Sequence, residues 1–128
     1  PVSKERGLEL ANAFFSASRG GDMTTLRSML AADVTVHSDG GGKRAAAAAP
    51  VVGIEEVMQL HVGLARLFAE RGSTLIRCAL INGLPGFVTR EADGVLQTTA
   101  LEVVDGKITG VYIVRNPDKL RHLEESVH

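Results

Sequence analysis

Residues 73–115 read STLIRCALINGLPGFVTREADGVLQTTALEVVDGKITGVYIVR, and this segment predicts a run of four β-strands. Its apolar stretches are 74–81, 86–91, 95–104 and 107–115, and they are separated by Asn82-Gly83, Asp93-Gly94 and Asp105-Gly106. Asn-Gly and Asp-Gly pairs favour tight hairpins because these residues tolerate the positive φ angles of a type I′ turn. The pairs are 11 and then 12 residues apart. This spacing predicts an antiparallel meander.

The first 39 residues predict two helices and one strand. Ser3 is suited to cap a first helix, which Gly20-Gly21 ends. Asp22 then caps a short second helix. After Ala31-Ala32, apolar and polar residues alternate through Val34–Ser38, which is the period of a strand.

A third helix follows Gly53 and ends at Gly72, with His61 on its broad apolar stripe. Before it, the alanine-rich stretch 45–49 predicts a short strand or an extended arm. After the meander, Asn116-Pro117 predicts the end of the sheet and a terminal helical turn. The order of elements therefore predicts an α+β fold, a curved antiparallel sheet covered on one face by three helices. Residues 1–128 are expected to form a single domain.

Composition excludes several classes of protein. The 128 residues carry 14 Lys+Arg against 15 Asp+Glu, a net charge of −1, and there are four Phe, one Tyr and no Trp. Neither a basic face nor a base-stacking platform is available, so we expect no direct nucleic-acid contact. The one cysteine, Cys78, fits a reducing cytoplasm, and no apolar run approaches the ~18 residues of a membrane span.

The segment Asp39-Gly40-Gly41-Gly42-Lys43 invites comparison with a phosphate-binding loop. The comparison fails because His37 stands where the first glycine belongs and Arg44 stands where the magnesium-binding hydroxyl belongs. A flexible turn and a docking motif remain as the two interpretations.

Other candidate residues have ordinary structural interpretations. His61 is either a hydrogen-bonded core residue or part of the lining of a ligand cavity. Cys78 has apolar neighbours, which favours an inert thiol over a nucleophile. His37 and Ser38 are adjacent on a strand and point to opposite faces, so they cannot share a pocket. No His, Asp, Glu or Cys grouping has metal-ligand spacing, and we expect neither a metal nor another cofactor.

The element order, with Ala32-Asp33-Val34-Thr35-Val36 leading from the second helix into the first strand, resembles the SnoaL-like branch of the nuclear transport factor 2-like superfamily. That resemblance implies a cone-shaped fold around an apolar cavity. The superfamily includes polyketide cyclases, ketosteroid isomerases and many non-enzymes, so the fold alone does not give the function.

Two motifs narrow the resemblance to extracytoplasmic-function sigma factors with a SnoaL-like C-terminal extension, the sigma-J-like group. They are Asp39-Gly40-Gly41-Gly42-Lys43 and Asn116-Pro117-Asp118-Lys119-Leu120. The resemblance implies a regulatory domain that modulates transcription initiation by contacting the sigma domains in cis and RNA polymerase. Both motifs would then lie at or near that contact. Because residue 1 is Pro, either an initiator Met has been removed or the chain is a piece of a longer protein.

Comparison with the isomerases predicts that the chain is not an enzyme. The general-base carboxylate of that family aligns with Ser38, which cannot abstract a carbon-bound proton without a base of its own. The oxyanion-holding tyrosine aligns near Phe14 or Phe15, and the oxyanion-holding acid near Thr98 or Thr99. The alternative interpretation is a small-molecule binder or cyclase/isomerase-like protein with a cavity lined by Phe15, Ser38, His61 and Thr99. A homodimer that forms through the open face of the sheet is compatible with a regulatory domain and with a small-molecule-binding protein.

Overall fold

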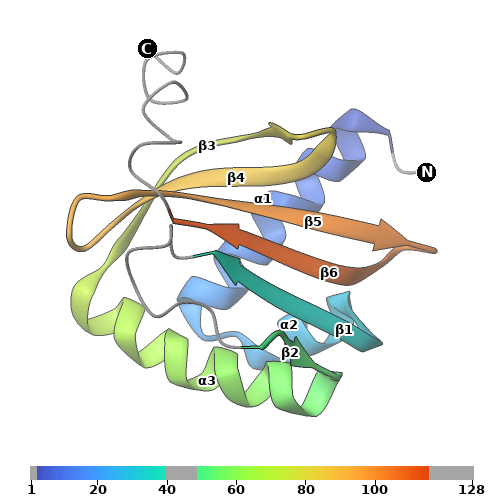
Figure 1. Ribbon diagram of the computed structural model, residues 1–128, viewed down its shortest axis with the longest axis horizontal. Coiled ribbons are helices and arrows are strands. Elements are labelled where there is room, and N and C mark those ends of the chain that lie inside the picture. The colour runs from blue at the N-terminus through green and yellow to red at the C-terminus, as the bar shows by residue number, and fades with distance from the viewer. Residues whose placement is uncertain (1–2, 40–48, 116–128) are drawn as a thin grey trace.

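The computed structural model describes residues 3–39 and 49–115. Three helices lie against one six-stranded sheet (Figure 1). The helices are α1 (Lys4–Gly20), α2 (Met23–Met29) and α3 (Ile54–Arg71). The strands are β1 (Leu30–Asp39), β2 (Val51–Val52), β3 (Ser73–Ile81), β4 (Leu84–Glu91), β5 (Leu96–Val104) and β6 (Lys107–Val114). The predicted α+β class and the three covering helices are confirmed.

The helix ends are made by the residues that the sequence indicated. The Arg6 N–H donates to Ser3 Oγ at 3.2 Å, which caps α1, and Gly21 ends that helix with a φ of 76°. The Thr25 N–H donates to Asp22 Oδ1 at 3.1 Å, which caps α2. One boundary differs from the prediction. Leu30 begins β1 directly after α2, whereas periodicity alone had extended the second helix to Ala32.

The strand order is β2-β1-β6-β5-β4-β3. The pairs from β3 to β6 are antiparallel, which confirms the meander. The sheet as a whole is mixed rather than wholly antiparallel, because β1 pairs parallel with β6. The short β2, which the sequence did not mark as a strand, pairs antiparallel with β1. The predicted arm at 45–49 lies mostly outside the described residues, as does the predicted helical turn after Asn116.

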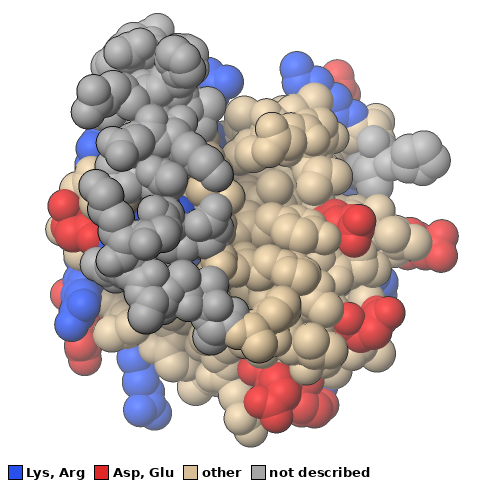
Figure 2. Space-filling view, in the orientation of Figure 1, with Lys and Arg blue, Asp and Glu red and all other residues tan. Residues whose placement is uncertain are grey.

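The core lies between the helices and the inner face of the sheet. Phe14 of α1, Val57 of α3 and Phe87 of β4 are almost fully buried there. The opposite, outer face is turned toward the viewer in Figure 2, where Lys and Arg do not gather over the described part of the sheet. No helix in the described ranges is long and apolar enough to cross a membrane.

Candidate functional site

The parallel pairing of β1 and β6 places Asp39, the first residue of one predicted motif, beside Val114, two residues before the other motif. Asp39, the last residue of β1, pairs with Val114, the last residue of β6. The remaining residues of the two motifs, Gly40, Gly41, Gly42 and Lys43, and Asn116, Pro117, Asp118, Lys119 and Leu120, lie outside the described residues. Two segments that are 77 positions apart in sequence (39 and 116) therefore leave adjacent strands at the same end of the sheet.

An aromatic pair lies on the outer face two residues before this end. The rings of His37 on β1 and Tyr112 on β6 stack with centroids 4.9 Å apart and planes 10° apart. His37 Nε2 also lies 3.1 Å from Thr35 Oγ1. Val34 and Val36 are buried on the inner face, so His37, one position after Val36, lies on the opposite face of β1. The stack holds the two strands together immediately before the motifs begin.

The β4–β5 turn contacts the same end of the sheet. Asp93 Oδ1 accepts from the Val95 N–H at 3.1 Å, and the Asp93 carboxylate forms an ion pair with the guanidinium of Arg115. Arg115 is the residue immediately before Asn116. The turn therefore contacts Arg115, the residue that follows the end of β6.

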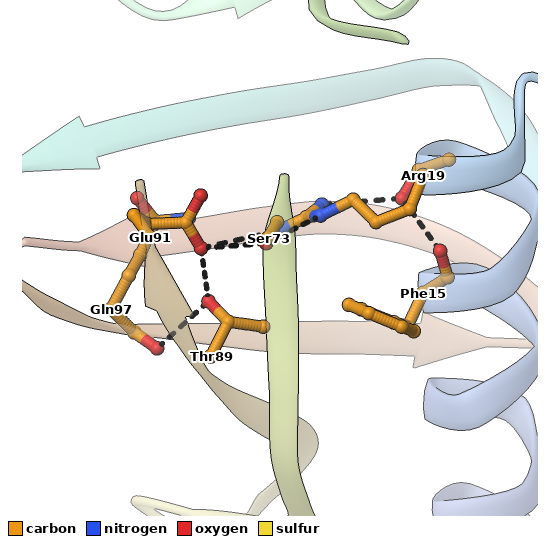
Figure 3. Close-up of polar contacts among 7 residues, drawn as sticks. Phe15, Arg19, Ser73, Thr89, Glu91 and Gln97 are labelled. Atoms are coloured by element: carbon orange, nitrogen blue, oxygen red, sulfur yellow. Dashed lines mark hydrogen bonds and ion pairs between the residues drawn. The ribbon is translucent and has the colours of Figure 1, made fainter. Parts of the chain in front are cut away.

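A buried polar cluster, which the sequence did not reveal, lies beside this end on the inner face (Figure 3). Arg19 of α1 donates from Nε to Ser73 Oγ at 3.2 Å, and Ser73 Oγ donates to Glu91 Oε2 at 2.9 Å. Thr89 Oγ1 donates to the same carboxylate oxygen. Arg19 Nη2 lies 3.7 Å from Glu91 Oε2, beyond hydrogen-bond distance. We call these four residues the Arg19 cluster.

Three phenyl rings surround the guanidinium of this cluster. Its Cζ atom lies 4.0 Å from the Phe68 centroid, 5.2 Å from Phe15 and 5.7 Å from Phe87. Burial lowers the pKa of Arg19, while the charge of Glu91 raises it. Arg19 Nη2 is a buried donor with no hydrogen-bond partner, an unusual and unfavourable state. The cluster ties α1, α3, β3 and β4 together at one point.

The four residues proposed as a cavity lining are only partly brought together. Phe87, Thr99, Ile113 and Ser38 follow one another across β4, β5, β6 and β1 in register, so their side chains share the inner face. Phe15 meets this row through an edge contact with Phe87 at 5.5 Å. Thr99 is buried, whereas Ser38 is exposed.

His61 lies within the helical layer next to the same row. Its ring meets Phe14 edge-on at 5.8 Å, and Phe14 in turn packs on Phe87. His61 Nδ1–H donates to the Val57 carbonyl at 2.9 Å, because a carbonyl oxygen can only accept. Burial lowers the pKa of His61, so the neutral ring is favoured.

The described residues offer little catalytic chemistry. Burial raises the pKa of the Cys78 thiol, which favours the unreactive form. Within residues 3–39 and 49–115, no three His, Cys, Asp or Glu side chains gather in a way that could hold a metal ion. The positions aligned with the isomerase acids are hydroxyl-bearing, with Thr98 and Thr99 both buried in β5.

Solved structures show the same fold in other proteins. A SnoaL-like protein from Burkholderia thailandensis superposes with a TM-score of 0.73 over 90% of this chain and 98% of its own, at 15% identity. The extracytoplasmic function sigma factor SigJ of Mycobacterium tuberculosis superposes with a TM-score of 0.67 at 30% identity, over 90% of this chain and 44% of SigJ. No family model matches the chain.

A sequence comparison points to the same relative. SigJ is 31% identical in a match 118 residues long, which covers 87% of this chain and 38% of SigJ. The chain has the SnoaL-like fold, and it is similar in both sequence and structure to one region of the extracytoplasmic function sigma factor SigJ. The resemblance expected from the two motifs is thereby confirmed. This SnoaL-like domain spans less than half the length of SigJ.

Proposed function

We propose that this SnoaL-like domain is a non-catalytic regulatory module, C-terminal in a longer sigma factor, that modulates transcription initiation. It acts in cis by contacting the sigma domains and, with them, RNA polymerase. Residues 39–43 and 116–120 contribute to that contact. The observation that carries this proposal is the pairing of Asp39 with Val114, since it starts both motifs from adjacent strands at one end of the sheet.

The kinship with SigJ supports the same proposal. SigJ is named as an RNA polymerase sigma factor, and more than half of its length lies outside the match to this domain. A regulatory role also fits the absence of acids at the positions aligned with isomerase chemistry, Ser38, Thr98 and Thr99. The charges at Asp39, Lys43, Asp118 and Lys119 are of both signs, which would fix the register of a contact.

The glycine run provides a test of the contact surface. Glycine lets a partner approach the backbone closely, and a large side chain at such a place blocks the approach. We expect Gly41→Trp to change promoter output of the full-length factor while the domain stays folded. A reporter assay measures the output, and thermal unfolding checks the fold.

Gly63→Trp is the matched control. Gly63 is exposed on α3, and a Cβ added there would meet nothing within 4 Å. We expect this variant to leave the output unchanged. If Gly41→Trp behaves like Gly63→Trp, residues 39–43 are not part of a regulatory contact.

A further inference from the structure

The outer face of the sheet, opposite the three helices, carries exposed apolar side chains. Val52 of β2 is 60% exposed and Val104 of β5 is 52% exposed. Both point outward, because their neighbours Val51 and Val103 pack against the core on the inner face. Isolated exposed apolar residues are normal on a protein surface, but these two valines lie on the same face of one sheet.

Strands β1 and β6 connect these two valines across the sheet. Thr35 of β1 pairs with Val52, and Gly110 of β6 pairs with Thr35. The Tyr112 ring leans across Gly110, since a Cβ atom added to Gly110 would lie 3.0 Å from Tyr112 Cε2. The same ring stacks on His37 of β1. We call the following residues the outer patch: Thr35, Val52, Val104, Gly110 and Tyr112.

Tyr112 is held in place before any partner arrives. Its contacts with His37 and Gly110 restrict the ring, so little side-chain freedom is left to lose on docking. Tyrosine is enriched in contacts between proteins because it presents an apolar ring and a hydroxyl group together. Tyr112 is only partly buried, and it is therefore suited to be the anchor of a contact.

Carboxylates border the outer patch. Glu102 of β5 is exposed and pairs with Gly110, and Asp105 is exposed in the β5–β6 turn. The cation of this hairpin, Lys107, is used elsewhere, because its Nζ donates to a carbonyl oxygen of α2 at 2.6 Å. Figure 2 shows acidic side chains along the right margin of this face. The outer patch is thus an apolar surface with a negatively charged border.

This charge pattern selects the kind of partner. A second copy docked by the same patch would bring Glu102 and Asp105 of both copies into one interface, and like charges placed together are unfavourable. A surface on which Lys and Arg surround apolar side chains is complementary instead. Such a surface is expected on the sigma domains of the longer factor, because protein surfaces that bind DNA are rich in Lys and Arg.

The outer patch is continuous with a residue of the proposed regulatory contact. Asp39, His37 and Thr35 occupy alternate positions on β1, so they share the outer face. Asp39 pairs with Val114 of β6, and Thr35 pairs with Gly110 of the same strand. One face of two adjacent strands therefore leads from Asp39 to the outer patch.

We propose that the outer patch docks on the sigma domains of the longer factor, against a surface where Lys and Arg surround apolar side chains. The inference rests on the proposed function and assigns to it a contact surface made of described residues. Val52 and Val104 provide the apolar area, and Tyr112 is the anchor between them. Glu102 and Asp105 pair with cations at the border.

Two charge variants of the full-length factor test the docking. Val104→Arg and Glu102→Arg each place a cation where the partner presents its own cations. We expect each to move promoter output toward that of a factor truncated before Pro1, by about fivefold or more, because like charges in a contact are costly. Glu102→Gln removes a charge without reversing it and should have a smaller effect.

Val62→Arg is the matched control. Val62 is 45% exposed and lies on α3, on the other side of the sheet. This variant introduces the same side chain away from the outer patch and should leave promoter output unchanged. Thermal unfolding of all variants should agree with wild type to within a few degrees, because substitutions at exposed positions change stability little.

Crosslinking in the full-length factor locates the partner directly. A photoreactive phenylalanine analogue is placed at position 104 and, in a control protein, at position 62. Irradiation followed by digestion and mass spectrometry identifies the crosslinked peptides. We expect position 104 to crosslink to peptides of the sigma domains and position 62 not to do so. Crosslinks that join position 104 to a second copy would overturn the choice of partner.

The outcomes separate this docking from the proposed function. If truncation changes the output but Val104→Arg and Glu102→Arg do not, the outer patch is not the contact and the proposed function stands. An equal effect of Val62→Arg would also overturn the docking. If truncation changes nothing, the proposed function is wrong. Crosslinks from position 104 to the sigma domains would then still support the docking, and their absence would overturn it too.

Discussion

His61 shows how burial of one side chain makes stability depend on pH. Burial is the main cause that lowers the pKa of His61. The hydrogen bond to the Val57 carbonyl opposes this effect, and the positive charge of Arg19 adds a smaller lowering effect on the pKa. In an unfolded chain, the pKa of histidine is about 6.5. Below that pH the unfolded state therefore binds more protons than the folded state at this residue. Acid then favours unfolding, and this contribution to stability is constant above about pH 7.

The prediction concerns the slope of stability against pH. We expect His61→Gln to reduce the fall in the free energy of unfolding between about pH 6.5 and pH 5. A single histidine contributes at most about 1.4 kcal/mol per pH unit to that fall. Urea denaturation of the wild type and the variant across this range measures both slopes. Equal slopes would mean that the folded chain binds the His61 proton as readily as the unfolded chain.

Sequence periodicity located His61 but could not identify its contacts. The apolar stripe of α3 predicts that this position faces inward, and His61 is 4% exposed. The ring neighbour Phe14 comes from α1, 47 positions earlier in the sequence. A pattern within one helix carries no information about which helix packs against it, so the sequence left both interpretations of His61 open.

At the scale of the element, the Arg19 cluster joins two helices to two strands. Sequence inspection assigns an arginine in the last turn of a helix to solvent and to the helix dipole. Arg19 instead turns inward, and its partners Ser73 and Glu91 are 54 and 72 positions away in sequence. Because these residues are far apart in the sequence, no local sequence pattern predicts that they pair.

We expect the contributions of Arg19 and Glu91 to the free energy of unfolding to be strongly coupled. Arg19→Met leaves the Glu91 carboxylate buried without a cation, and we expect a loss of about 3–5 kcal/mol in the free energy of unfolding. Glu91→Gln should also destabilise the fold, and the double variant should lose clearly less than the sum of the two. Urea denaturation of the four proteins completes the cycle.

The exposed Arg27–Glu55 pair provides the control for this cycle. Its two side chains are 48% and 74% exposed, so Arg27→Gln should change stability little. If Arg19→Met were no more harmful than Arg27→Gln, the Arg19 cluster would not be a stabilising link between the helices and the sheet.

The three hairpin turns show what local sequence patterns can predict and what they cannot. Asn82-Gly83 and Asp105-Gly106 form tight turns in which both residues of each pair have positive φ, as predicted. Asp93-Gly94 also lies in a hairpin, but only Gly94 has a positive φ and the connection is longer. Asp93 uses its side chain to accept from Val95 instead. The dipeptide predicts the hairpin correctly, but it does not reveal the contacts of the Asp93 side chain with Val95 and Arg115.

At the scale of the whole molecule, the order of strands decides which segments of the chain leave the sheet at the same end. The sequence predicts the meander because each hairpin is local, but the partner of β1 comes from the far end of the chain. Only the folded sheet shows that β1 lies beside β6 and runs parallel to it (Figure 1). This long-range pairing brings Asp39, where one motif begins, beside Val114, two residues before the other motif, and the proposed regulatory contact depends on it.

The most direct test compares promoter output of the full-length factor with that of the same factor truncated before Pro1. If the domain regulates the factor in cis, we expect a large change of output, and the direction of the change tells whether the domain activates or inhibits. Equal output from the two proteins would mean that the domain has no regulatory role. The search would then turn to small molecules that bind the inner face near Phe15, His61 and Thr99.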